Sequence, residues 1–277
     1  MVHYDPSGLK SSDYEHPSDR AALAALKSIP VVDKLLAVYL DFSIKSNMYV
    51  QDKGDGFRVT GETYPRLYDL YETALSRLNM QKEPKLLIKY DYEYNAYATG
   101  INEPYVMLHS SFVNDASDEE LLYIIGHELG HINSGHVLYH NLASILGNEL
   151  TGIFKGFAPL ISVGLMYSLY DWQRKSELTA DRAGTIAAGG TENAIKGLSR
   201  LMGQTGCNPY VNFSTENMLA QYEDFDMSRD SVVGKLIYTV QTLPQGHPWS
   251  IMRIKALTDW AETEQYRTVL SRAQGSC

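Results

Sequence analysis

The chain has 277 residues, of which 44% are apolar and 21% are charged, and this composition is typical of a folded globular protein rather than a disordered one. Its formal net charge of -9 argues against nucleic acid as the main partner, because proteins that bind nucleic acid usually present a basic surface. Two cysteines, Cys207 and Cys277, are too few for a disulfide framework, and residues 1–10 lack the apolar core of a secretory signal peptide. We therefore expect a cytoplasmic protein.

The N-terminal part of the chain, residues 1–60, predicts a helical segment that contains no motif we recognise. Residues 1–15 are polar, and we expect them to be poorly ordered. Ser18 is placed to cap a helix over residues 19–26, and a second apolar helix is expected over residues 31–45.

The middle of the chain predicts one more helix and then a small sheet. Residues 63–79 place their apolar side chains on one helical face. Three short runs follow, residues 86–88, 92–99 and 105–109, and the turn residues between them indicate strands. Later segments have helical periodicity. The sequence therefore predicts a mainly α protein of the α+β class, with one small sheet directly before the helix that carries its clearest functional motif.

That helix begins at Ser117, which can form a capping box with Glu120. It carries the sequence His-Glu-Leu-Gly-His, in which His127 and His131 lie four residues apart on one helical face. Two imidazoles at this spacing can bind one zinc ion, and Glu128 is placed to take a proton from a zinc-bound water. This pattern predicts a catalytic site with one zinc ion per chain.

A catalytic zinc ion usually has three protein ligands, so a third ligand must be found. Val137 stands where a metzincin has its third histidine, and Ser134 stands where it has a glycine, which excludes that arrangement. His136 and His140 are expected to be structural or surface residues, because His136 would point away from the metal on a continuing helix.

Two carboxylates are the candidates for the third ligand. Glu149 has a plausible separation in sequence but no supporting residue four positions later. Glu177 is favoured because Asp181 follows on the same helical face and can accept a hydrogen bond from a ligating imidazole. A solvated acidic face is the alternative interpretation of Glu177 and Asp181.

Four segments together resemble a known family of zinc metallopeptidases, the gluzincins that include the heat-shock peptidase HtpX and the CaaX prenyl protease. The His-Glu-Leu-Gly-His helix with residues 135–136 is similar to the family's zinc helix, and residues 177–181 are similar to its third-ligand segment. Residues 95–100 resemble the family's edge strand. Residues 247–248 and 253–254 resemble its late His-Pro and Arg-Ile element.

The resemblance implies a zinc-dependent endopeptidase and assigns roles to individual residues. His127, His131 and Glu177 would bind the zinc ion. Glu128 would be the general base, and His247 would contact the carbonyl oxygen as it becomes negative. A peptide or protein would be the substrate. The alternative is a catalytically idle protein that is stabilised by zinc and binds a peptide or a protein partner.

The remaining implied residues lie around the metal. Asn95 and Ala96 would bind the substrate backbone along the edge of the sheet. Arg253 would help to hold this region in place. The resemblance thus implies a zincin-like metallopeptidase domain over residues 61–277, expected to be one compact unit, with its small sheet beside the metal-binding helix.

Membrane attachment is where the sequence departs from the family's integral-membrane members. The one candidate segment is residues 150–170, and its part without charge, residues 156–170, has 15 residues, whereas roughly 18–20 are needed to cross a bilayer. Gly156, Pro159 and Gly164 also interrupt it. We interpret it as a buried helical hairpin between the two metal-binding helices. Peripheral contact with a membrane is the alternative to a purely cytoplasmic location.

Overall fold

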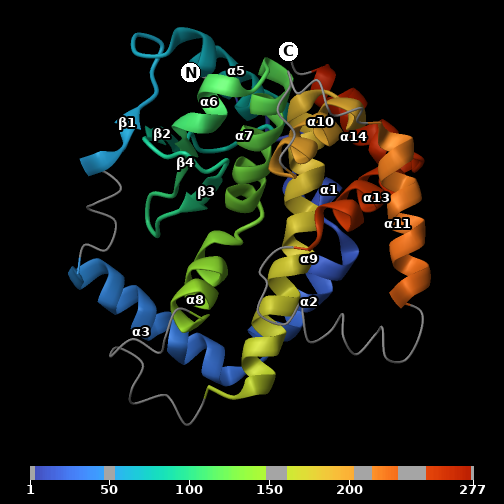
Figure 1. The fold of residues 1–277 in the computed structure, drawn as a ribbon. Helices are drawn as coiled ribbons and strands as arrows, with labels where there is room; N and C mark the ends of the chain where they lie inside the picture. The colour runs from blue at the N-terminus through green and yellow to red at the C-terminus, as the bar shows by residue number, and fades with distance from the viewer. Residues whose placement is uncertain (1–3, 47–53, 148–160, 203–213, 230–247, 276–277) are drawn as a thin grey trace.

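The computed structural model describes residues 4–46, 54–147, 161–202, 214–229 and 248–275. Helices dominate these residues, and a four-stranded sheet lies to one side of them (Figure 1), which confirms the predicted mainly α, α+β class. The elements in chain order are α1 (Ser11–Tyr14), α2 (Pro17–Lys27), α3 (Pro30–Ser46), β1 (Phe57–Arg58), α5 (Pro65–Arg77), β2 (Lys85–Lys89), β3 (Ala96–Thr99), β4 (Tyr105–His109), α6 (Ser110–Asp115), α7 (Asp118–Asn133), α8 (Val137–Gly147), α9 (Val163–Ala188), α10 (Thr191–Leu201), α11 (Thr215–Arg229), α13 (Ser250–Ala261) and α14 (Glu264–Gln274).

The predicted helices and strands are present, but three of them start two or more residues away from the expected position, and the short strand β1 was not predicted. Helix α5 begins at Pro65 rather than at residue 63. Helix α2 is capped by His16 rather than by Ser18, because the His16 ring accepts a hydrogen bond from the Ser18 backbone N–H at 3.2 Å. Pro17 then takes the first helical position, where a missing N–H costs nothing. Strand β3 begins only at Ala96, because a carboxylate oxygen of Asp91 accepts the Glu93 backbone N–H at 3.1 Å and holds a turn before it.

Residues 4–15 are ordered and packed, so the prediction of a poorly ordered N-terminus was wrong for them. Leu9 and Tyr14 are buried in the main core. The Tyr14 hydroxyl accepts a hydrogen bond from the Asn133 side chain at 3.0 Å, and Arg182 donates to the Tyr14 carbonyl oxygen at 3.2 Å. Contacts with residues far along the chain order this segment, and its polar composition could not reveal them.

The sheet has the strand order β1-β2-β4-β3, with β2 and β4 parallel and the two outer strands antiparallel to their neighbours. Alternate side chains of β2 and β4 point to opposite faces. One face joins the main core through Leu86, Ile88, Val106 and Leu108, and the other face carries a smaller cluster of Leu87, Tyr105, Met107 and Tyr97. Because β3 is last in the strand order, it lies at one edge of this sheet, where α7 and α8 contact it.

Helix α9 connects the main core to a second one. Figure 1 shows it between the sheet with α7 on one side and the C-terminal helices α13 and α14 on the other. Its first half packs with α2, α3 and α8 through Leu165, Leu169 and Trp172, and its second half packs with the main core through Ala183, Ile186 and Ala187. Glu177 lies between these halves, which places its side chain at the junction of the two cores.

Helices α7 and α9 cross at a line of very small residues. A Cβ atom added to Gly130 would lie 2.5 Å from the Cβ of Ala183, and one added to Gly126 would lie 2.2 Å from the Cβ of Ala187. No side chain larger than hydrogen fits at either glycine without a shift of the helices. This close approach brings the histidine face of α7 within reach of Glu177 on α9.

No helix among the described residues is both long and apolar enough to cross a membrane. Residues 148–160, which include part of the predicted hairpin, lie outside the described residues. In the described part, the prediction of a buried segment is confirmed for Leu165 and Leu169, but it is wrong for Val163 and Tyr167, which are exposed. This end of α9 is amphipathic rather than buried on all sides.

The helix crossing yields the first prediction. Gly130→Ala should lower the free energy of unfolding by about 1–3 kcal/mol, because a methyl group is forced into a filled contact. Adding Ala183→Gly should recover part of that loss by removing the Cβ that the methyl group meets. The measurement is urea unfolding of the metal-free proteins, with Gly54→Ala as the matched control because no atom lies within 4 Å of a Cβ there. Equal effects at Gly130 and Gly54 would contradict the close contact.

Candidate metal centre

Local sequence starts α7 and burial holds it in place. Ser117 forms the predicted capping box, accepting the Glu120 backbone N–H at 3.3 Å and donating its own to the Glu120 carboxylate at 2.7 Å. Arg200 on α10 binds the same carboxylate at 2.7 Å. Residues 121–131 are all buried. The two histidines of this helix therefore stand in the interior, facing α9.

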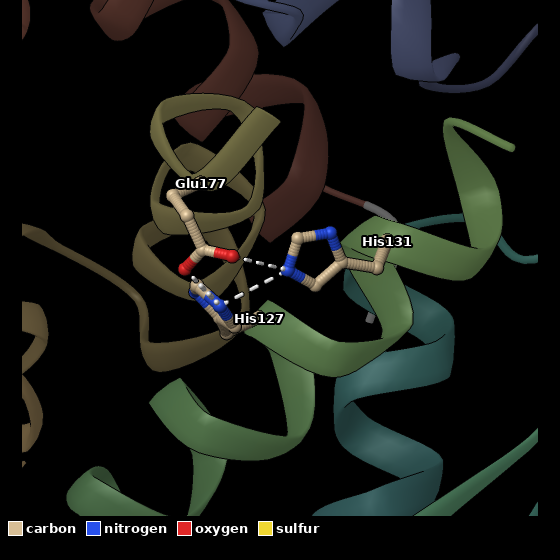
Figure 2. A group of neighbouring side chains, drawn as sticks. All are labelled: His127, His131 and Glu177. Atoms are coloured by element: carbon tan, nitrogen blue, oxygen red, sulfur yellow. Dashed lines mark hydrogen bonds and ion pairs between the residues drawn. The ribbon is translucent and has the colours of Figure 1, made fainter. Parts of the chain in front are cut away.

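His127, His131 and Glu177 converge at one point (Figure 2). The two Nε2 atoms are 3.3 Å apart, and each lies 3.3 Å from an oxygen of Glu177. Ligands at 2.0–2.1 Å from a tetrahedral zinc ion are about 3.3 Å from one another, so the donor set and its spacing fit such an ion. Among the residues that the structure describes, this is the one cluster with the geometry to hold a metal.

Asp181 lies behind His127, as the sequence predicted. Its Oδ1 atom is 3.0 Å from Nδ1 of His127 and accepts the Tyr123 hydroxyl at 2.7 Å. Arg253 donates to both carboxylate oxygens, at 2.9 and 2.5 Å. Burial alone would raise the pKa of Asp181, but the Arg253 charge and these hydrogen bonds hold it well below its usual value. The ionised carboxylate can accept Nδ1–H and leave Nε2 of His127 for a metal.

The carboxylates of Glu177 and Asp181 favour positive charge on the neighbouring imidazole rings, whereas burial of the rings opposes it. Burial lowers the pKa of His131 to about 4, although Glu177 acts in the opposite direction. Burial also opposes charge on His127, but its hydrogen bonds to Asp181 and Glu177 outweigh that effect and raise its pKa to about 10. A proton or a metal ion can supply the positive charge, and a metal must displace the proton because it needs the same nitrogen.

Two cavities meet at this cluster. The larger has a volume of about 610 Å³ and extends toward α8, and the smaller has a volume of about 230 Å³ and extends toward α13. Glu128 is 7% exposed and lines both. The residues shared by the two cavities are Asn95, Ala96, His127, Glu128 and Glu177.

Strand β3 pairs with only one of the strands that the structure describes, and its other edge faces the larger cavity. The Asn95 carbonyl oxygen accepts the His109 backbone N–H at 3.1 Å, so this pair is hydrogen-bonded between β3 and β4. Bonded and non-bonded pairs alternate along an antiparallel ladder. The backbone groups of Ala96 and Ala98 therefore point away from β4, and both residues line the larger cavity.

His136 is a buried residue outside the cluster of His127, His131 and Glu177, as predicted, but it packs against His131 instead of pointing elsewhere. Helix α7 ends at Asn133, and Gly135 takes a left-handed conformation with φ of 71°. The His136 N–H then donates to the His131 carbonyl oxygen at 2.9 Å, which closes a Schellman turn. The turn folds the chain back, so His136 is buried and its Nδ1 lies 3.1 Å from Nδ1 of His131. Gly135, read as a helix-ending glycine, was the available sequence signal.

The other candidate residues divide between described and undescribed parts of the chain. His140 lies beside the larger cavity, with Nε2 at 2.7 Å from the Ser176 hydroxyl. Glu149 and His247 lie outside the described residues. Pro248, which follows His247 directly, lines the smaller cavity.

Comparisons with known proteins find a metallopeptidase and proteases. The chain is 27% identical over 268 residues to the plastoglobule-localized metallopeptidase 48 of Arabidopsis thaliana. The aligned region covers 96% of this chain and 77% of that protein. It is 37% identical over 111 residues to a protease HtpX homolog of Bacteroides fragilis, covering 39% of this chain and 32% of that protein. Protease HtpX of Pseudomonas savastanoi pv. phaseolicola is 31% identical over 161 residues, covering 48% of this chain and 54% of that protein.

No solved structure matches the chain significantly. The model of peptidase family M48 matches residues 63–261, which include the metal cluster, the edge strand and Arg253. The match confirms the resemblance to the metallopeptidases that include HtpX. The chain therefore belongs to peptidase family M48.

Proposed function

We propose that the chain is a zinc-dependent endopeptidase in which Glu128 is the general base. The observation that carries this proposal is the cluster of His127, His131 and Glu177, whose ligand atoms are separated by the 3.3 Å expected around a tetrahedral zinc ion. The cluster stands where two cavities meet, beside a free strand edge. Membership of a peptidase family supports peptide bonds as the target.

The chain's own side chains divide the chemistry. His127, His131 and Glu177 would hold the zinc ion, which when bound lowers the pKa of water and polarises a carbonyl group. Glu128 directly follows the first ligand in sequence and lines both cavities, so it can take the proton of the attacking water and return it to the leaving amine. Asp181 orients His127.

The arrangement of the cavities favours cleavage within a chain over trimming of its ends. One cavity continues from the cluster toward α8 and the other toward α13. A substrate can therefore extend on both sides of the bond to be cut. The backbone groups of Ala96 and Ala98 would pair with an extended peptide, and Asn95 would lie beside its backbone, since Asn95 and Ala96 line both cavities.

His247 is proposed as a donor to the carbonyl oxygen as negative charge develops on it. The family resemblance supports this role, and so does Pro248, which lines the smaller cavity together with Glu128. Arg253 would hold this region through its two hydrogen bonds to Asp181.

For location we propose peripheral association with a lipid surface as an alternative to a purely cytoplasmic protein. The Arabidopsis relative is plastoglobule-localized by name. Val163 and Tyr167 expose large apolar side chains at the start of α9 and would be the contact.

The ligand assignment predicts one zinc ion per chain. His127→Ala, His131→Ala and Glu177→Ala should each lose most of the metal, because each removes one of three protein donors. Zinc content after dialysis against buffer, measured by atomic emission, checks this, with Glu149→Ala as the matched acidic control that should keep its zinc. Full zinc in Glu177→Ala together with loss in Glu149→Ala would show that the third ligand is misassigned.

If Glu128 is the general base, changing it should reduce catalysis and leave zinc binding unchanged. Glu128→Gln keeps the size and hydrogen bonding of the side chain but cannot accept a proton, so zinc content and melting temperature should stay unchanged while peptide hydrolysis falls by at least about 10²-fold. Cleavage of an unfolded protein by both forms is the measurement. Equal activities would remove Glu128 from the mechanism, and an inactive wild type that binds zinc and peptide would support the catalytically idle binding protein instead.

The strand edge predicts a backbone effect on substrate binding. Ala98→Pro removes an N–H that points away from β4, so the sheet should form while an added peptide strand loses one hydrogen bond. We expect KM to rise by roughly 5–10-fold, the equivalent of about 1–1.5 kcal/mol for one hydrogen bond. Ala98→Ser keeps the N–H and is the control. An unchanged KM in Ala98→Pro would place the substrate elsewhere.

A further inference from the structure

We infer that Asp19, on the N-terminal helix α2, is a positioning residue of the metal centre and acts on the ligand His131 through His136. The inference rests on the metal centre proposed above. Asp19 lies outside the part of the chain that matches the peptidase family model, residues 63–261.

Asp19 is a buried carboxylate whose partners are donors. It is 2% exposed. Trp172 donates its indole N–H to Oδ1 at 3.0 Å, and Thr179 donates its hydroxyl to Oδ2 at 2.6 Å. Nε2 of His136 lies 3.0 Å from the same Oδ2. The indole N–H of Trp172 can only donate and a carboxylate ion can only accept, so Asp19 is arranged to accept from all three partners.

The acceptor at Asp19 determines where the protons of the two histidines lie. An ionised carboxylate can only accept, so Nε2 of His136 must carry a hydrogen. An imidazole that carries its one hydrogen on Nε2 accepts at Nδ1. That atom faces Nδ1 of His131 at 3.1 Å, so His131 donates from Nδ1. Its Nε2 keeps a lone pair, and Nε2 is the atom that faces His127 and Glu177.

Both histidine ligands are thus supported by a buried carboxylate, in two different ways. Asp181 contacts His127 directly, whereas Asp19 reaches His131 through one intervening imidazole. A partner on the outer nitrogen fixes the tautomer and the ring orientation of a metal-binding histidine. The helix that carries Asp19 packs against α9, which also carries Glu177. Helix α2 therefore contributes to the metal site as well as to the core.

A purely structural role for Asp19 makes a different prediction, because its bonds to Trp172 and Thr179 also attach α2 to α9. Trp172→Phe removes one of those bonds, keeps an aromatic ring beside His136 and leaves the path from Asp19 through His136 to His131 complete. It is the matched control. Asp19→Asn replaces one acceptor by a donor, which conflicts with the donors around it, and His136→Phe interrupts the path.

The test measures zinc affinity of the full-length variants by competition with a chromophoric chelator, together with the melting temperature of each metal-free protein. Asp19→Asn and His136→Phe should each bind zinc about 10–100-fold more weakly than wild type, as expected for loss of an outer partner. The double variant should be no weaker than the weaker single variant, because both changes break one path. Trp172→Phe should stay within about 3-fold of wild type, even if it melts at a lower temperature.

The cobalt-substituted protein gives a second measurement, its visible absorption spectrum, which does not depend on the stability of the fold. The visible absorption bands of bound Co²⁺ should shift in Asp19→Asn and His136→Phe, because the His131 ring loses its fixed orientation, and should be unchanged in Trp172→Phe. Wild-type zinc affinity and cobalt spectrum in Asp19→Asn would overturn the inference while leaving the proposed function intact. Failure of the wild type to bind zinc would instead overturn the proposed function.

Discussion

The close contact between α7 and α9 is the constraint on which the site depends. Gly126 and Gly130 on one helix meet Ala183 and Ala187 on the other, and no Cβ fits at either glycine. Close-packed interiors do not deform continuously, so even one added methyl group must move a helix. The two histidines lie on the first helix and Glu177 on the second. The packing of four small residues therefore sets the separation of the atoms that we propose as metal ligands.

Charge is organised around the same crossing. Arg253 neutralises Asp181, and Asp181 in turn contacts His127. On the other side of the cluster, donors from α9 surround Asp19, which contacts His136. Buried charges are costly unless they are paired, and each of these carboxylates is paired within hydrogen-bonding distance. The centre is consequently formed from helices that are distant in sequence, from α2 near the start of the chain to α13 near its end.

Much of this arrangement follows from patterns that are local in sequence. The capping box at Ser117 specifies where α7 begins, and the four-residue spacing of its histidines puts them on one face. The same spacing linked Glu177 to Asp181. The helices α3 and α5 and the strands β2, β3 and β4 were likewise predictable from the local sequence pattern, whereas the two-residue strand β1 was not. In each case the interacting residues lie within a few positions of one another, so regular backbone geometry determines the outcome.

What the sequence did not determine were contacts between distant segments and the direction of the chain after a helix ends. Extrapolating α7 past Asn133 turned His136 away from His131, whereas the left-handed Gly135 folds it back. Asp19 is one acidic residue in the first turn of a helix, and only the packing of α2 on α9 makes it a partner of His136. The sequence by itself determined which proposed ligands share a helical face, because helical geometry is periodic. Tertiary packing alone decided which buried groups support them, because it joins segments whose separation in sequence carries no periodic signal.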